Sequence, residues 1–152
     1  MTTRDELIDG FRMIIREGQR TTGDFAPGHW TTRVHDEEDG WNVKQIYAHL
    51  TAIAEVTPGL LGALANADEE RPPDAETTPV AARAELSPEA LMQAFESAFQ
   101  KLIEFVQTMP DENLELKRKF GAVEGPVADI MSSVIVLHSL AHIYSAGGSA
   151  AG

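Results

Sequence analysis

Apolar residues recur along the chain at the three- and four-residue spacing of amphipathic helices. In the first such stretch, roughly residues 3–19, charged side chains alternate with one apolar stripe formed by Leu7, Phe11, Ile14 and Ile15. Side chains at positions i, i+4, i+7 and i+8 share one face because a helix repeats every 3.6 residues. The pattern therefore predicts an amphipathic helix whose apolar stripe is buried.

A second helix is predicted over residues 41–66, where the apolar period resumes after a loop rich in glycine, proline and acidic residues. One face of this helix carries Ile46, His49, Ile53 and Val56. Because the other three residues are aliphatic, we expect this face to be buried and His49 to occupy a core-facing position.

The third helix has clear start and stop signals. Ser87 is a favourable N-cap because its hydroxyl can accept a hydrogen bond from a free backbone N–H group, and Pro88 suits the first turn, where no N–H group is needed. Pro110 ends the pattern because proline cannot continue a helix. The predicted buried stripe consists of Leu91, Phe95, Ala98, Leu102 and Phe105.

The fourth helix is predicted from Pro126 to about Ala146, before a pair of glycines that is typical of a helix end. The few small residues that follow should fray. We therefore predict one domain over residues 1–147, followed by a flexible C-terminal tail over residues 148–152.

These helices, with no convincing strand between them, indicate an all-α fold, a four-helix bundle. The link over residues 67–86 is about twenty residues long, whereas antiparallel neighbours need only roughly two to eight. A link of that length can cross the bundle and join two helices that run in the same direction. The preferred topology is therefore up-down-down-up, with a long crossover between helices 2 and 3, although the first loop, residues 23–40, is nearly as long.

The composition limits the class of protein. At 152 residues, with 43% hydrophobic and 24% charged residues, the chain suits one globular domain. Its formal charge of -12 would repel a phosphate backbone, so we expect no nucleic-acid partner. It contains no cysteine, which excludes disulfides and thiolate ligands. Neither a signal peptide nor a membrane-spanning stretch stands out, so we expect a cytoplasmic protein without membrane contact.

Two histidines, His138 and His142, stand one helical turn apart in the last apolar helix. Side chains at i and i+4 lie on one face of a helix, so both rings can reach one metal ion. His49 lies about eight residues, or roughly 12 Å, from the start of its helix, and His138 lies about as far from the end of the fourth. In the preferred topology these two helices are antiparallel, so the three rings come to a similar depth.

Burying three imidazoles without partners would cost about 1–3 kcal/mol each, whereas a divalent ion would satisfy all three lone pairs. Three neutral histidines leave at least one coordination position open, which is typical of catalytic rather than structural zinc sites. The alternative is that the three are unrelated core histidines bonded to backbone groups or water. The residues favour a metal site formed by His49, His138 and His142.

The helix that opens with Trp41 and carries the sequence AHL, together with H-x-x-x-H near the end of the last helix, resembles the DinB/YfiT-like family. The resemblance covers nearly the whole chain in the number and order of helices. It implies a four-helix bundle in up-down-down-up order, often dimeric, with zinc or nickel held by His49, His138 and His142. Many relatives follow the last histidine with a basic residue, Gly and Gln, whereas this chain reads HIYSAGG.

Members of this family and its close relatives are similar to thiol-dependent transferases or isomerases that use mycothiol, bacillithiol or glutathione, and others are hydrolases. The resemblance therefore implies a metal-dependent enzyme that activates water or a low-molecular-weight thiol, acts on a small-molecule substrate and forms a homodimer. The alternative function is a non-catalytic helical bundle, a binding or dimerisation module with a structural metal or none.

No residue is assigned a catalytic role. Residues 138–142 lack the glutamate of the H-E-x-x-H motif, so this helix supplies ligands but no general base, and Glu55 points away from the proposed site. Ser145 shares the face of the last two histidines and is a candidate pocket residue. His29 and Trp30 lie in the first loop, which should border the same end of the bundle, and are candidates for the substrate entrance.

Overall fold

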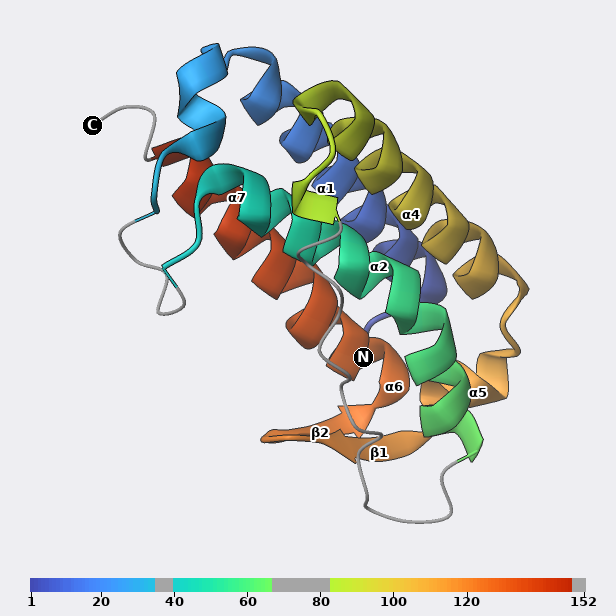
Figure 1. The fold of residues 1–152 in the computed structure, drawn as a ribbon. Helices are drawn as coiled ribbons and strands as arrows, with labels where there is room; N and C mark the ends of the chain where they lie inside the picture. Colours follow the sequence, from blue (N-terminus) through green and yellow to red (C-terminus); the bar gives the residue numbers. More distant parts are fainter. Residues whose placement is uncertain (35–39, 67–82, 149–152) are drawn as a thin grey trace.

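The computed structural model describes residues 1–34, 40–66 and 83–148, and its long helices pack side by side into a bundle (Figure 1). The long helices are α1 (Arg4–Gly23), α2 (Val43–Asn66), α4 (Pro88–Thr108) and a final helix made of α6 (Val127–Met131), a π-helical segment (Ser132–Leu137) and α7 (His138–Gly148). The shorter elements are a 3-10 helix (Pro27–Thr31), α5 (Asp111–Glu115), β1 (Lys117–Phe120) and β2 (Val123–Pro126). The predicted four-helix bundle is confirmed.

Local hydrogen bonds explain where the first and third long helices begin. The Thr3 hydroxyl accepts from the Glu6 backbone N–H at 3.1 Å, and the Glu6 carboxylate accepts from the Thr3 N–H at 3.0 Å, which is a reciprocal capping box. At α4 the predicted N-cap is confirmed, since the Ser87 hydroxyl accepts from the Ala90 N–H at 3.2 Å. Each cap satisfies backbone donors that have no partner inside the helix.

Contacts between helix ends establish the directions of the helices. The start of α1 meets the end of α4, where the Arg4 guanidinium donates to the Val106 carbonyl. The start of α2 meets the end of α7, because His49 lies beside His142, with ring centroids 5.4 Å apart. The start of α1 meets the start of the final helix, where the Thr2 N–H donates to the Asp129 carboxylate, and Gly147 lies against Thr21 at their other ends, so these two helices run in parallel. The order is therefore up-down-down-up, as predicted, while residues 67–82 of the crossover lie outside the described residues.

An aromatic chain runs through the centre of the bundle and ties three helices together. Tyr47 of α2 packs edge-on against Phe95 of α4 at 5.5 Å between ring centroids, and Phe95 packs against Phe99 at 5.1 Å. Phe99 in turn meets Phe11 of α1 at 6.5 Å, and these four side chains are fully buried. Tilted and edge-on ring pairs add to the area that they bury, so this chain stabilises the packing of α1, α2 and α4.

Two side chains of the predicted buried stripes, one aliphatic and one aromatic, are more exposed than expected. Val56 is 45% exposed and Phe105 is 37% exposed, so placing them in the buried stripes was wrong. His49 likewise lies at the margin and not in the core: it precedes the fully buried Leu50 by one residue, or about 100° of rotation. Apolar spacing alone did not distinguish the centre of the buried face of α2 from its edge.

The expectation that the chain contains no strand was also wrong. β1 and β2 form an antiparallel hairpin in which Lys117 pairs with Pro126 and Phe120 with Val123. Gly121, with φ of 59°, opens the two-residue turn, which is the position that a type II′ turn gives to glycine. The alternation in β1 is hard to recognise because one inward side chain is Arg118, which donates to the Leu64 carbonyl at 2.9 Å.

Two helical stretches, Val43–Asn66 and Val127–Gly148, are long and apolar enough by length and composition to cross a membrane, contrary to the expectation from the sequence. In each, 44% of the most apolar window is buried against the rest of the structure. Both stretches also line the bundle core, and a core helix passes the same test of length and apolarity. Packing inside the bundle therefore accounts for part of their apolar character.

The close approach of α1 and α4 at Gly18 leads to a prediction about stability. A Cβ atom at Gly18 would lie 2.7 Å and 2.9 Å from two ring carbons of Phe95. We expect Gly18→Ala to lower the free energy of unfolding in urea, because overpacking of about 1–3 kcal/mol exceeds the roughly 1 kcal/mol gained in helix propensity.

The matched control is Gly59→Ala, since no atom lies within 4 Å of a Cβ built at that helical position. This variant should be unchanged or up to about 1 kcal/mol more stable. Equal stability of the two variants would contradict the packing described for Gly18.

Candidate metal centre

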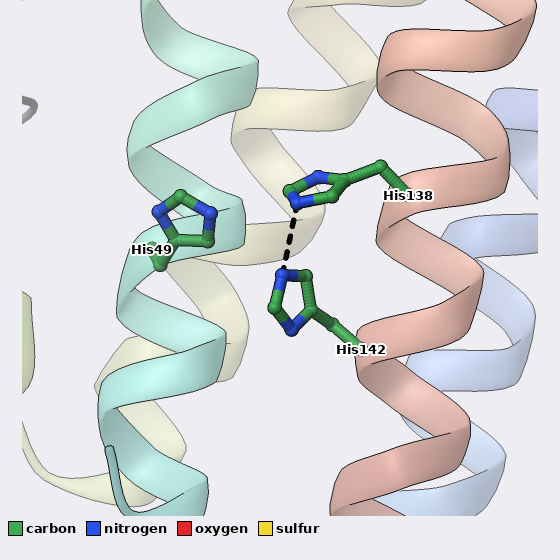
Figure 2. Close-up of side chains that lie close together, drawn as sticks. All are labelled: His49, His138 and His142. Carbon is green, nitrogen blue, oxygen red and sulfur yellow. Dashed lines mark hydrogen bonds between the residues drawn. The ribbon is translucent and has the colours of Figure 1, made fainter. Parts of the chain in front are cut away.

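Three histidine side chains meet between α2 and α7 (Figure 2). His138 and His142 project from α7 toward α2, and His49 lies across from them. Ring nitrogens of the three residues all lie within 4.8 Å of one another. The ring centroid of His49 is 5.6 Å from that of His138 and 5.4 Å from that of His142. The structure therefore brings together the three side chains that the sequence predicted to share one depth.

The two rings on α7 are in direct contact. Their Nε2 atoms are 2.9 Å apart, so one neutral ring donates its N–H to the lone pair of the other. The pKa of His138 lies below the ordinary histidine value, because partial desolvation disfavours the charged ring and because His142 repels it. The ring is thus held in the neutral form, which is the form that binds metals.

The donor set fits a divalent transition metal. Zinc takes histidine nitrogens at about 2.0–2.1 Å, and two such nitrogens on one ion lie roughly 3 Å apart. The 2.9 Å separation of the Nε2 atoms of His138 and His142 is compatible with that spacing. Imidazole suits zinc, nickel and copper, whereas calcium and magnesium prefer oxygen ligands. Because His138 is exposed on its outer side, the site faces solvent.

Residues 11–137 match the profile of the family described as the mycothiol maleylpyruvate isomerase N-terminal domain. The chain belongs to this family. A comparison with curated proteins finds no match. The matched range of this isomerase-type domain includes His49 and ends one residue before His138.

Solved structures of low sequence identity share the fold. YfiT from Bacillus subtilis, described as a probable metal-dependent hydrolase with an unusual four-helix bundle topology, matches with a TM-score of 0.70 and 16% identity, over 96% of this chain and 85% of that chain. The mycothiol-dependent maleylpyruvate isomerase matches with a TM-score of 0.73 and 16% identity, over 96% of this chain and 61% of that chain. A mutant of the isomerase matches with a TM-score of 0.68 and 14% identity, over 91% of this chain and 60% of that chain.

These likenesses support the resemblance to DinB/YfiT-like proteins that the sequence suggested. At 14–16% identity, the likeness to these solved structures shows that the chain shares their fold. This chain covers only about three fifths of the length of the solved isomerase, so that enzyme has a large part with no counterpart here.

Trp41 is a site residue that the sequence analysis missed. Its ring lies against that of His49, with centroids 4.7 Å apart. The Val34 N–H donates to the Trp41 carbonyl and the Val43 N–H donates to the Thr32 carbonyl, each at 3.0 Å, which fixes the segment that leads into α2. The signal in the sequence was a bulky aromatic residue two positions before the helix that carries a candidate ligand.

A reciprocal cap sets where α2 begins and thereby where His49 lies. The Asn42 side-chain oxygen accepts from the Gln45 N–H at 2.8 Å, and the Gln45 side-chain oxygen accepts from the Asn42 N–H at 2.9 Å. This arrangement is equivalent to a capping box. Since His49 follows about two turns later, the cap and the aromatic packing of Trp41 together position this candidate ligand.

His29 and Trp30, predicted to line the substrate entrance, are buried at 9% and 8% exposure. His29 Nε2 lies 3.0 Å from the Ala146 carbonyl oxygen, one turn beyond His142 in α7. Trp30 packs edge-on against Tyr47 at 5.8 Å between centroids. These contacts show that both residues hold the first loop against the bundle, and their role at a substrate entrance stays a prediction.

The structure describes no carboxylate in the cluster formed by the three histidines. Glu55 pairs with Arg83 at 2.7 Å and is thus engaged elsewhere, as expected. Burial raises the pKa of the Tyr47 phenol, which keeps it neutral and unsuited as a base.

Ser145 is partly buried and follows His142 by three residues, and its role in a pocket stays a prediction. The rest of the first loop that could border the site, His35 and the acidic residues 36–39, lies outside the described residues.

The contact between His29 and Ala146 predicts a loss of stability on substitution. His29→Ala removes a hydrogen bond and leaves a buried carbonyl without that partner, so the free energy of unfolding should fall by about 1–3 kcal/mol. Thr31→Ala removes only an exposed hydrogen bond to the Gly28 carbonyl in the same 3-10 helix, so it is the control and should change stability by less than about 0.5 kcal/mol. Urea denaturation of both variants measures the difference, and equal midpoints would argue against the structural role of His29.

Proposed function

We propose that this chain is a metal-dependent enzyme or enzyme domain in which His49, His138 and His142 hold a divalent ion, with zinc and nickel as the leading candidates. The observation that carries the proposal is the convergence of three ring nitrogens within 4.8 Å at a solvent-facing position. The bound ion would supply Lewis acidity and lower the pKa of a water or thiol in its open position.

The residues of the chain supply binding and orientation. With their protons on Nδ1, the neutral imidazoles of α7 would offer two adjacent Nε2 lone pairs from one helix, and His49 would offer a third from the facing helix. Trp41 covers one side of the His49 ring and restricts its rotation. Since the described cluster contains no carboxylate, a proton released there has to pass to solvent, to the substrate or to a residue outside it.

The reaction that we propose is thiol transfer or hydrolysis on a small-molecule substrate. The isomerase described as mycothiol-dependent shares the fold and supports a low-molecular-weight thiol as cosubstrate, and YfiT, described as a probable hydrolase, supports water in the same role. A cytoplasmic homodimer without a nucleic-acid partner is also part of the proposal. The formal charge of -12 supports the exclusion of nucleic acid.

A second candidate function is a non-catalytic bundle. The hydrogen bond between His138 and His142 favours it, because each of these rings has a polar partner without any ion. The two candidates differ in what an ion would do, so metal binding is tested first and activation of a bound group second.

Metal binding should depend on all three histidines. Purified without an affinity tag and supplied with zinc or nickel, the wild type should retain about one equivalent after dialysis, measured by mass spectrometry of the bound metal. His138→Ala should bind at least about tenfold to a hundredfold more weakly, since even loss of a residue behind a ligand has that effect. Tyr144→Ala, at an exposed position of the same helix, is the control and should bind like the wild type. If the wild type retains less than about a tenth of an equivalent of metal, the proposal is wrong.

Trp41 should report the bound ion. Nickel is paramagnetic and quenches nearby indole fluorescence, and Trp41 lies against the His49 ring. We expect nickel to quench Trp30→Phe, which retains Trp41, and to leave Trp41→Phe largely unquenched. Equal quenching of the two variants in a fluorescence titration would show that the ion binds elsewhere.

A cobalt-substituted protein then distinguishes the two reaction types. Titration with a low-molecular-weight thiol should produce thiolate-to-cobalt charge-transfer absorption if the thiol occupies the open position. Cobalt binding without this absorption would favour water as the activated group. Protein that binds zinc or nickel but shows neither cobalt binding nor this absorption would favour the non-catalytic bundle.

A further inference from the structure

The buried stripe of the final helix does not follow the period of an α-helix. From Met131 it continues at Ile135, Ser139 and Ile143, which are three successive steps of four residues between buried positions. Each such step overshoots one turn of an α-helix by about 40°, so three of them rotate the stripe by roughly 120°. A regular helix would carry this stripe away from the core.

The π-helical segment over residues 132–137 absorbs this excess. A π-helical turn contains about one residue more than an α-helical turn, because its hydrogen bonds span five residues. The extra residue offsets the rotation by about 100°, so Ile135, Ser139 and Ile143 remain buried along a straight bundle. The sequence predicted a regular helix over this range, and the structure corrects that prediction.

The same offset decides where the two histidines of α7 point. In an uninterrupted α-helix, His138 and His142 would follow Met131 by seven and eleven residues, which returns them to the face of Met131. Met131 is fully buried, so both imidazoles would then face the centre of the core. In the structure His138 is exposed and His142 is partly buried, and both face His49 across the margin of the bundle (Figure 2).

The π-helical segment is seated against a glycine of α1. A Cβ atom at Gly10 would lie 2.9 Å and 3.0 Å from the two methyl carbons of Val136. Val136 is buried at 7% exposure, so α1 and the segment approach closely only because Gly10 has no side chain. Upstream, the Thr2 N–H donates to the Asp129 carboxylate at 2.6 Å and fixes the height of α6 against the start of α1.

We infer that the π-helical segment Ser132–Leu137, seated on Gly10, positions the metal-binding histidines of α7 by rotating them from the core centre to the solvent-facing margin opposite His49. Gly10 and Val136 are positioning residues that contact neither metal nor substrate. The inference rests on the proposed metal site for its functional meaning. The register of the helix can be measured without any metal.

The first experiment uses a pair of compensating substitutions. Gly10→Ala displaces Val136 and should weaken zinc or nickel binding by at least about tenfold, as expected for a residue that orients ligands. Gly10→Ala combined with Val136→Ala removes the clash and should recover most of the affinity. Gly59→Ala, whose added methyl meets no atom within 4 Å, is the matched control with unchanged affinity.

Melting temperatures measured on the same samples separate positioning from stability. A merely structural contact would lower the melting temperature of Gly10→Ala and leave the affinity of the folded protein unchanged. That outcome, or failure of the double variant to recover affinity, would overturn the inference.

The second experiment measures the register in metal-free protein by proton NMR. Ring protons of His49 should show nuclear Overhauser effects to those of His138 and His142, whose ring centroids lie 5.6 Å and 5.4 Å away. Deletion of Ser133, an exposed residue of the π-helical segment, should abolish these signals because it rotates α7 by about 100°. Persistence of the signals in the deletion variant, or their absence in the wild type, would overturn the inference.

The two proposals can fail separately. Wild-type protein that shows the ring contacts but binds neither zinc nor nickel would disprove the metal site and leave the register intact. Protein that binds metal equally well in the wild type, Gly10→Ala and the Ser133 deletion would support a metal site and disprove the positioning role. If the deletion variant does not fold, the Gly10 and Val136 pair decides the question.

Discussion

The three imidazoles can meet only if the final helix presents them at one particular rotation about its axis. Depth along the bundle is set by the rise of about 1.5 Å per residue, whereas an error of one residue turns a side chain by about 100°. The π-helical segment supplies this one-residue adjustment immediately before His138. Close packing of Val136 on Gly10 then makes the rotation a property of the interface between α1 and the final helix, not of the final helix alone.

The opposite side of the site depends on the packing of α2. Tyr47, two residues before His49, is held between Trp30 and Phe95, with ring centroids 5.8 Å and 5.5 Å away. These contacts join α2 to the first loop and to α4. His49 therefore projects from a helix that is anchored from two sides, while the ring itself lies at the margin beside Trp41. Rigid support of a ligand in this way lowers the cost of organising a metal site.

The parts of the fold that could be predicted depend on the position of a residue along its helix axis and on local chemistry. Caps such as Ser87 and the shared depth of His49 and His138 follow from residue types and from counting residues along helices. The parts that could not be predicted depend on the rotation of a helix about its axis and on contacts between segments that are distant in the sequence. Residues 132–137 read as part of an ordinary α-helix, and the contact of Val136 with Gly10, more than a hundred residues earlier, cannot be read from the sequence. The hairpin could not be predicted because β1 has only four residues, and three of them are cationic.

The residue types in the candidate metal centre affect the charge that a bound ion would keep, which the helix geometry alone does not determine. Three neutral imidazoles contribute no negative charge, so the full charge of a bound divalent ion would be left for the groups in its open positions. Such a site favours an anion there, such as hydroxide or thiolate, more strongly than a site with carboxylate ligands would. In the proposed enzyme, a cluster without a described carboxylate would leave more positive charge to activate the nucleophile, and the proton that the nucleophile loses would pass to solvent, to the substrate or to a residue outside the cluster.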